Sequence, residues 1–234
     1  MVGKRMLLRI LNTLKKIFLF LFAAQFIYII VLRWVNPPIT VTQIGSVISG
    51  YGLNRDYVAF KDISPYAALA VISSEDQLFP DHNGFDVKSI KKAMDSNSKK
   101  SKRLRGASTI SQQVAKNVFL WQGRSWFRKG LEVYFTFMIE AVWGKQRILE
   151  VYLNVAEMGK GIFGIEAAAQ KYFKKSAKRL TRTESAKIAA ALPNPRSYVV
   201  NPPSAYINKR YPWVMLQMSN LSDDPDIQRV LQSR

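Results

Sequence analysis

The hydrophobic residues of the chain begin with a long apolar run near the N-terminus. From Ile17 to Leu32, sixteen residues contain a single uncharged polar side chain. Extending the run to Val35 gives nineteen residues, close to the roughly 20 that a membrane-spanning helix requires. We therefore predict an uncleaved transmembrane anchor over residues 17–35, ended by the prolines that follow.

Charges on the two sides of this run predict its orientation. Arg33 is the only basic residue between Leu32 and Arg55, whereas five basic residues precede Ile17: Lys4, Arg5, Arg9, Lys15 and Lys16. The positive-inside rule places the basic segment 1–16 in the cytoplasm and the chain after about residue 36 outside. A cleaved signal peptide is the alternative. Its apolar core would be about 7–15 residues long, and no small-x-small cleavage site follows Leu32.

Beyond the anchor, apolar residues recur mainly at helical spacing. We predict a linker or jaw region at 36–62, irregular or short-stranded, then a mainly α-helical domain at 63–222 and a tail at 223–234. The predicted helices are 65–75, 86–97, 109–119, 126–143, 145–157, 164–173, 182–192 and 204–220. The basic segment 95–105 has no periodicity, which predicts a loop that is either a mobile flap or simply solvated.

Composition narrows the chemistry. The chain has no cysteine, which excludes a disulfide scaffold, thiol catalysis and a cysteine-ligated metal. A single histidine argues against a histidine-rich metal site. The net charge of +19 indicates an anionic partner: nucleic acid, an anionic membrane surface or a phosphorylated substrate.

The first candidate site lies at the end of the predicted helix 65–75. Ser64-Pro65 is typical of a helix start, and an apolar body leads to Glu75 and Asp76. Carboxylates in a last helical turn face the negative end of the helix dipole, which is unfavourable. Because these acids destabilise the end of the helix, we regard them as candidate functional residues.

Two further segments carry candidate chemistry. On a helix, Ser108, Gln112 and Lys116 would line one face; this stripe suits sugar hydroxyls and one phosphate, with a solvated helix face as the alternative. Next, Arg124, Arg128 and Lys129 surround a helix start capped by Ser125, where amides and cations together bind anions. The interleaved Trp121, Trp126 and Phe127 indicate either a membrane-interface surface or core aromatics beside a basic edge.

The predicted helix 126–143 is apolar almost all round, which predicts a position in the middle of the bundle. Glu132 is one of its few polar residues, and Arg128 one turn earlier can pair with it. A purely structural ion pair is the alternative to a functional glutamate.

Five blocks of the chain, over about residues 63–200, together resemble the family 51 glycosyltransferases, the peptidoglycan glycosyltransferases. They are Glu75-Asp76-x-x-Phe79-x-x-His82-x-Gly84, Gly106-x-Ser108-Thr109-Ile110-Ser111-Gln112-Gln113-x-x-Lys116-Asn117, Arg128-Lys129-x-x-Glu132, Lys145-x-x-Ile148-Leu149-Glu150-x-Tyr152-Leu153-Asn154 and Ala191-Leu192-Pro193-Asn194-Pro195. The chain ends too soon after the fifth block for a transpeptidase domain, so it is similar to the monofunctional biosynthetic form.

The resemblance implies a lysozyme-like, mainly helical fold with a membrane-associated jaw. It also implies polymerisation of lipid II, a polyprenyl-pyrophosphate-linked disaccharide pentapeptide, by inverting transfer. Glu75 would be the general base, and Glu132 would stabilise or orient the reacting end of the donor. The pyrophosphate would be held by Lys116, Arg124, Arg128 and Lys129, and the donor by Ser108, Gln112 and Gln113; Asn117 completes the implied substrate-binding set.

The same resemblance implies the setting of the protein. Its partners would be lipid II, the nascent glycan strand and the bilayer, with room for other cell-wall synthesis proteins and no nucleic acid. It would lie in the bacterial cytoplasmic (inner) membrane as a single-pass protein, with the catalytic domain on the outer, periplasmic face. The sequence requires no cofactor and shows no dedicated metal cage, although a divalent cation, magnesium or manganese, could share the pyrophosphate.

Two other functions remain open from the sequence. A lysozyme-like hydrolase would cleave the same polymer with an acidic glutamate and water, without needing the cation cluster at 124–129. A membrane-tethered basic binding protein would be explained by charge, but charge does not require the uncharged Ser108, Gln112 and Gln113.

Overall fold

The computed structural model describes residues 2–98, 108–123 and 125–232. The chain divides into two compact units, residues 1–37 and 38–234. The first unit contains helix α1 (Val2–Val31). Its segment Met6–Val31 contains an 18-residue window with a mean hydropathy of 2.0 and is long and apolar enough to cross a membrane. The helix ends four residues before the predicted anchor does, since residues 32–34 form a turn.

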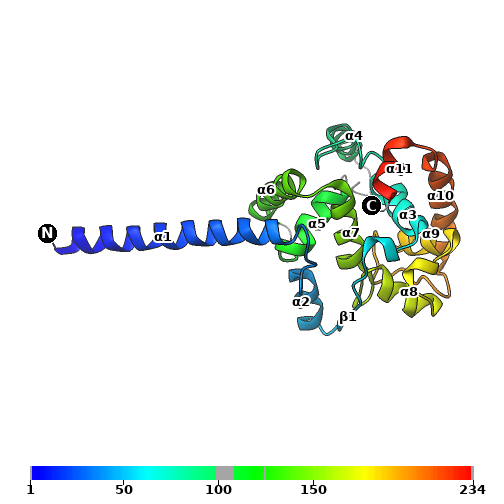
Figure 1. Ribbon diagram of the computed structural model, residues 1–234, viewed down its shortest axis with the longest axis horizontal. Coiled ribbons are helices and arrows are strands. Elements are labelled where there is room, and N and C mark those ends of the chain that lie inside the picture. Colours follow the sequence, from blue (N-terminus) through cyan, green and yellow to red (C-terminus); the bar gives the residue numbers. More distant parts are fainter. Residues whose placement is uncertain (1, 99–107, 124, 233–234) are drawn as a thin grey trace. The chain divides into compact units, whose positions relative to one another are not determined.

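The second unit is mainly helical, as predicted (Figure 1). Its helices include α3 (Pro65–Glu75), α5 (Ile110–Phe119), α6 (Trp126–Val142), α7 (Lys145–Val155), α8 (Ile165–Phe173), α9 (Arg182–Ala191) and α10 (Ala205–Leu221). The remaining helical elements are α2 (Val41–Ile48), η1 (Phe60–Asp62), α4 (Val87–Ser98), η2 (Ala177–Arg179) and α11 (Pro225–Leu231).

A small sheet joins the jaw region to the segment between α7 and α8. Strands β1 (Asn54–Arg55), β2 (Glu157–Gly159) and β3 (Ile162–Phe163) are arranged in the order β1-β3-β2. Asn54 pairs with Ile162 in parallel, and Glu157 pairs with Phe163 in antiparallel orientation. The predicted helix 145–157 therefore ends two residues early.

Helix α3 lies at the centre of the unit. Its residues from Ala67 to Ser73 are all buried, and it packs against α9, α10 and α11. Helix α5 packs against α6 and α7 on the other side of the unit. Ser64 precedes α3 as predicted, but its hydroxyl donates to the carbonyl of Leu180 at 2.9 Å and does not cap the helix. The central helix thus ends at Glu75 inside the fold.

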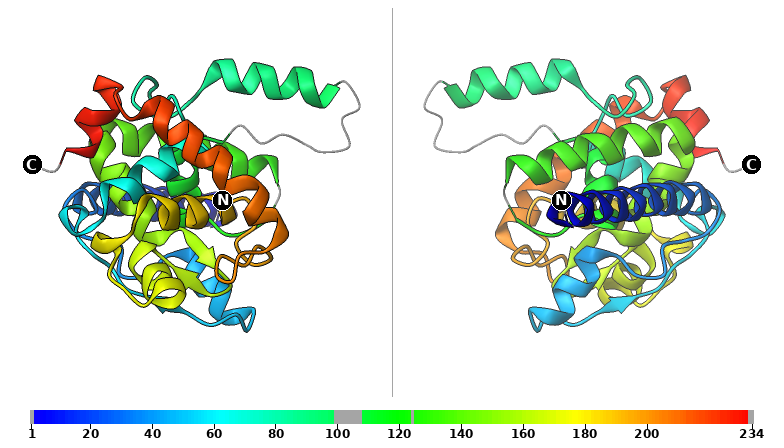
Figure 2. Two further views of the ribbon diagram at one scale, coloured as in Figure 1. Left: turned by 90° about the vertical axis from the view of Figure 1, so that its right-hand side faces the viewer. Right: turned by 90° about the vertical axis from the view of Figure 1, so that its left-hand side faces the viewer.

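Several predicted loops are helical. The linker region contains α2, and the tail contains α11, which Asp224 caps through its side chain. Residues 95–98 of the predicted basic loop belong to α4, which stands apart from the packed helices (Figure 2). Residues 99–105 of that loop lie outside the described residues.

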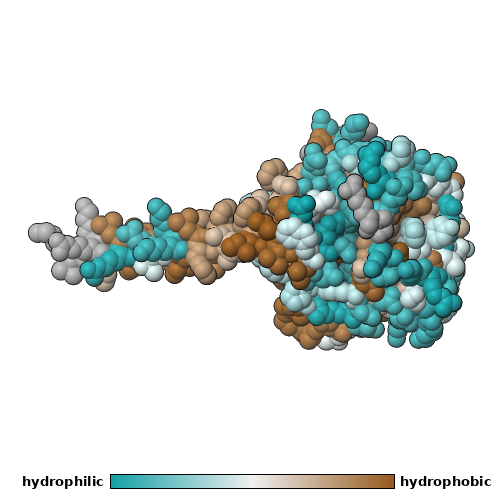
Figure 3. Space-filling model, viewed as in Figure 1, coloured by the Kyte–Doolittle hydropathy of each residue, from teal (hydrophilic) through white to brown (hydrophobic). Residues whose placement is uncertain are grey.

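The prediction that helix 126–143 lies in the middle of the bundle is wrong. Among its residues, Glu132, Thr136 and Ile139 are buried, whereas Trp126 and Phe127 are 93% and 72% exposed. Helix α2 shows the same inversion. It buries Thr42, Gln43 and Ser46 and exposes apolar side chains, and the resulting brown patch is visible at the place of α2 in Figure 3.

Candidate active site

Glu75 ends α3 and is half-buried. The amide Nε2 of Gln113, from α5, donates a hydrogen bond to Glu75 Oε2 at 2.8 Å. Burial raises the pKa of Glu75 above its ordinary value of 4.5, and Asp76 adds to this rise. The Gln113 hydrogen bond and the positive charges of Arg210 and Lys116 oppose it. Glu75 is therefore a carboxylate whose affinity for a proton is enhanced by its surroundings.

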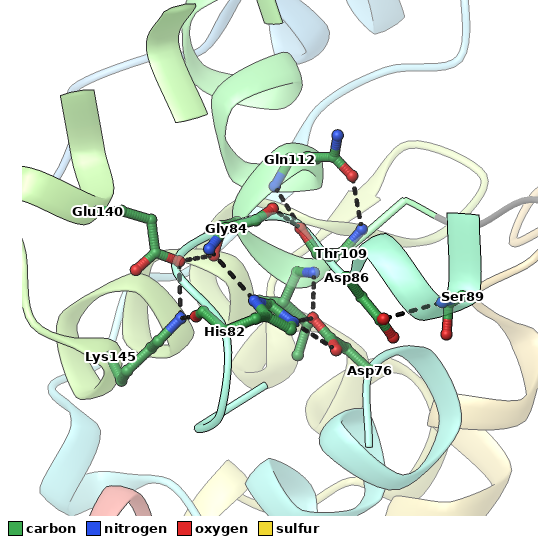
Figure 4. A network of polar contacts seen from close by, with 11 residues as sticks. Asp76, His82, Gly84, Asp86, Ser89, Thr109, Gln112, Glu140 and Lys145 are labelled. Atoms are coloured by element: carbon green, nitrogen blue, oxygen red, sulfur yellow. Dashed lines mark hydrogen bonds and ion pairs between the residues drawn. The ribbon is translucent and has the colours of Figure 1, made fainter. Parts of the chain in front are cut away.

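The neighbouring Asp76 is fully engaged. Its Oδ1 lies 3.0 Å from His82 Nε2, and its Oδ2 accepts from the backbone amide of Ile110 at 3.0 Å. His82 Nδ1 accepts from the amide of Gly84 at 3.2 Å, so the imidazole carries its proton on Nε2 and donates to Asp76 (Figure 4). Of the two adjacent acids, Glu75 is the one available to a substrate.

The segment after Glu75 is fixed on three helices. Thr109 Oγ1, at the start of α5, donates to the Gly84 carbonyl at 2.7 Å. Lys145, on α7, donates to the His82 carbonyl and pairs with Glu140 of α6 at 2.8 Å (Figure 4). Gly84 has a φ of +86° and lies so close to α6 that a β-carbon would be 2.7 Å from Thr136 Cγ2. Glycine is therefore required where the loop touches α6.

Glu132 is the centre of a second charged cluster. Its side chain is buried and pairs with Arg128 at 3.0 Å and with Lys129. The predicted Arg128–Glu132 pair is thus confirmed. Ser125 caps α6 as predicted, because its hydroxyl accepts from the amide of Arg128 at 3.1 Å. Arg124 lies outside the described residues.

Lys116 lies within electrostatic reach of both glutamates. Burial lowers its pKa from 10.5, Arg128 and Lys129 lower it further, and the negative charges of Glu132 and Glu75 oppose this. Lys116 therefore interacts electrostatically both with Glu75, which has no ion-pair partner in the described residues, and with Glu132, which has two. An anion bound beside Lys116 would stabilise the charged form of the lysine, because it would offset burial and the positive charges of Arg128 and Lys129.

The predicted polar stripe on one helical face is only partly present. Ser108 is exposed and precedes the helix, because Thr109 caps α5. Gln112 is buried, and its Oε1 accepts from the amide of Thr109 at 3.0 Å in a capping box. The role of Gln112 and Ser108 in substrate binding stays a prediction. Gln113, which the sequence resemblance assigned to the donor, hydrogen-bonds to Glu75.

Glu75 lines one cleft and its hydrogen-bond partner Gln113 lines another. The first, about 450 Å³, is lined by Ser74, Glu75, Asp76, Gln77, Leu78, Asp86, Ser89, Ser108 and Thr109. The second, about 380 Å³, is lined among others by Gln113, Lys116, Asn117, Gln122, Tyr152, Glu157, Asn194 and Arg196. The first cleft therefore carries carboxylates and hydroxyls, and the second carries cations and amides. Within the described residues, no cluster of three or more histidine, aspartate or glutamate side chains could hold a metal ion.

The family is decided by comparison with known sequences. The family model described as transglycosylase matches residues 41–219. The chain belongs to the transglycosylase family. The match includes the five blocks recognised in the sequence, and also residues 41–62 of the jaw region with α2.

Transglycosylases from several bacteria are similar to this chain over most of its length. A biosynthetic peptidoglycan transglycosylase of Escherichia coli is 56% identical over 179 residues, which are 76% of this chain and 74% of the relative. The protein of the same name from Mannheimia succiniciproducens is 59% identical over 171 residues, covering 73% and 70%. A third, from Salmonella schwarzengrund, is 57% identical over 175 residues, covering 75% and 72%.

Sequence reasoning missed three side chains beside this transglycosylase site. The positive charge of Arg210, on α10, lowers the pKa of Glu75. Its guanidinium carbon lies 3.7 Å from the centre of the Trp213 ring. Glu140 accepts from Ser111 and pairs with Lys145. Tyr152 donates to Gln113. Arg210 stands outside every recognised block, and only the packing of α10 on α3 reveals it.

Proposed function

We propose that the chain polymerises lipid II into glycan strands by inverting transfer, with release of polyprenyl pyrophosphate. The proposal rests on membership of the transglycosylase family and on one observation of the site. Lys116 interacts electrostatically with both Glu75 and Glu132, so the candidate proton acceptor, Glu75, and the cation cluster around Glu132 lie close to the same lysine.

Glu75 takes the proton of the acceptor's 4-hydroxyl as that oxygen attacks the anomeric carbon of the donor. A general base must be ionised at working pH and still hold a proton well, which is what burial opposed by nearby cations provides. Such a base contributes about 10²–10⁴ in rate. Asp76 does not compete, because His82 and Ile110 occupy its oxygens.

The departing pyrophosphate needs cations and no acid, because it leaves as an anion. Lys116 provides one charge beside Glu75, and Arg128 and Lys129 provide two more beside Glu132. Glu132 holds these two side chains in place and so orients the anion-binding cluster. Arg124 is proposed for the same cluster on the sequence alone.

The two clefts suit the two substrates. The first, with the carboxylates of Glu75 and Asp86 and several hydroxyls, suits an uncharged acceptor sugar and repels a pyrophosphate. The second, with Lys116, Asn117 and Gln113, suits the donor. A divalent cation could be carried in by the pyrophosphate itself, with the cluster supplying the remaining positive charge.

The inverted burial of α2 and α6 supports contact with a bilayer. Large exposed apolar faces are rare on soluble proteins. Here Ile48, Trp126 and Phe127 are exposed, whereas α2 buries polar residues and α6 buries Glu132 and Thr136. Together with the span Met6–Val31, they support a single-pass protein of the cytoplasmic membrane whose domain lies on the outer face, where a lipid-linked substrate is presented.

Purified protein incubated with labelled lipid II tests this function. We expect a glycan polymer and free polyprenyl pyrophosphate, formed in step with each other. The rival hydrolase would shorten preformed strands and make no polymer, and a binding protein would leave lipid II unchanged. Either of these results would refute the proposal.

A further inference from the structure

A chain of two hydrogen bonds leads from the core to Glu75. The hydroxyl of Tyr152, on α7, lies 3.3 Å from Oε1 of Gln113, on α5. The other end of the same amide, Nε2, lies 2.8 Å from Glu75 Oε2. Three helices thus meet at one side-chain amide. Tyr152 is only 1% exposed, so its hydroxyl cannot turn to bulk water.

The directions of these hydrogen bonds are fixed by chemistry. An ionised carboxylate only accepts hydrogen bonds, so the NH₂ group of Gln113 must face Glu75. The amide oxygen then points to Tyr152, which must be the donor. Burial and the negative charges of Glu75 and Asp76 raise the pKa of Tyr152 well above 10.0, so that the hydroxyl keeps its proton.

We propose that Tyr152 is a positioning residue for the reaction, because its hydroxyl holds the Gln113 amide with its NH₂ group toward Glu75. This proposal rests on the proposed function of Glu75 as the base. With the amide held this way, Glu75 accepts a hydrogen bond that favours its ionised form and fixes one oxygen, leaving the other for the acceptor hydroxyl. Without the tyrosine hydroxyl only the carboxylate orients the amide, so the hydrogen bond to Glu75 is held less firmly and stabilises the ionised form less.

Other charged groups around Glu75 are unchanged by removal of this hydroxyl. They are Asp76 at the end of α3, Lys116 on α5 and Arg210 on α10. None of them hydrogen-bonds to Tyr152 or to the Gln113 amide in the described part of the chain. A change in the titration of Glu75 after loss of the hydroxyl therefore reports on the amide.

Tyr152→Phe removes the hydroxyl and keeps the ring. In the full-length protein, we expect the acid limb of the rate of lipid II polymerisation against pH to move upward by about half to one unit. The rate below the limb falls by about three- to tenfold, and the rate above it approaches that of the wild type. Tyr172→Phe is the matched control, since the Tyr172 hydroxyl donates to the Met158 carbonyl at 3.1 Å, away from Glu75; its limb should not move.

Gln113→Leu provides the second arm. It should raise the limb at least as far as Tyr152→Phe, and the double variant should show no further shift, because both act through one amide. An unmoved limb in Tyr152→Phe, or shifts that add in the double variant, would overturn the inference, even if the melting temperature falls. The wild-type curve separates the two proposals: no polymer from the wild type refutes the function itself, whereas polymer with an unmoved limb refutes only the role of Tyr152.

Discussion

Glu75 lies in an environment that disfavours its ionised form. Burial raises its pKa in the folded protein above the ordinary value, so between these two values the native state binds more protons than the unfolded state. Stability then falls as pH rises through this window. Above it, ionised Glu75 destabilises the fold, which is expected of a group retained for chemistry.

The same shift predicts how the activity depends on pH. Only ionised Glu75 accepts a proton, so the rate should rise with pH along a limb whose midpoint lies above 4.5, the ordinary value for glutamate. The measurement is the initial rate of polymerisation between about pH 4 and 9 at low substrate concentration, which reports the free enzyme. A midpoint at or below the ordinary value would mean that Glu75 is not the titrating base.

Lys116 supports a different prediction at this scale. Lys116→Ala removes a cation that interacts electrostatically with both glutamates and should weaken the binding of the pyrophosphate. We expect KM for lipid II to rise and kcat/KM to fall by about 10²-fold, the usual loss for one electrostatic contact to a departing anion. Lys187→Ala, on α9 and stacked on Tyr211, is the control. An unchanged dependence of rate on lipid II concentration would exclude this role of Lys116.

Single residues were predictable where the signal is local. The acids at the end of a helix and the Arg128–Glu132 pair are separated by one turn or less, so the sequence alone indicates them. The partner of Gln113 was not predictable. Whether its amide faces Glu75 or the donor depends on how α5 packs against α3, and Arg210 approaches from a helix that follows much later in the chain.

At the scale of elements, two helices of apolar composition differ in how far their apolar side chains are buried. Helix α3 is apolar and its residues from Ala67 to Ser73 are buried, whereas α6 is apolar and exposes Trp126 and Phe127. The hydrophobic pattern of a helix does not state whether its apolar face meets protein or lipid. The burial of Glu132 and Thr136 shows the difference, because polar side chains take the protein-facing side of α6.

The loop between α3 and α4 gives a prediction for an element. Gly84→Ala would force a β-carbon to within 2.7 Å of Thr136 Cγ2 at a φ of +86°. We expect a loss of unfolding free energy of about 1–3 kcal/mol and reduced polymerisation, because the displaced loop carries Asp76 and adjoins Glu75. Denaturant unfolding and the lipid II assay measure both.

Gly45→Ala is the matched control. Gly45 lies inside α2, and a β-carbon there would meet nothing within 4 Å. Because alanine is the better helix former, by about 1 kcal/mol, stability should stay equal or rise. Equal stability of the Gly84 and Gly45 variants would contradict the close approach of the loop to α6.

At the scale of the whole molecule, the basic charge and the apolar faces fit the same surroundings. A net charge of +19 attracts anionic lipid headgroups and a pyrophosphate substrate alike. The apolar span in the N-terminal unit and the exposed faces of α2 and α6 in the other unit each favour lipid. The sequence allowed short strands in region 36–62 but did not predict the pairing of the small sheet, which depends on contacts made only after folding. Helices α2 and α11 were not predicted either, although Thr40 and Asp224 cap their first turns.

The absence of cysteine allows a direct test of orientation. A cysteine introduced at Gly3 should be protected from a membrane-impermeant thiol reagent in intact spheroplasts, and one introduced at Asp223 should react. Permeabilisation should make both react. Protection of the Asp223→Cys variant with labelling of the Gly3→Cys variant would place the domain in the cytoplasm and contradict the proposed orientation.

The central claim is that Glu75 accepts the proton of the attacking hydroxyl, and Glu75→Gln tests it most directly. We predict a fall in polymerisation of at least about 10²-fold, with lipid II binding retained. The melting temperature at neutral pH should be equal or higher, since a buried charge that opposes folding is removed. A variant that folds and keeps more than about a tenth of the wild-type rate, against the loss expected for a general base, would contradict the account.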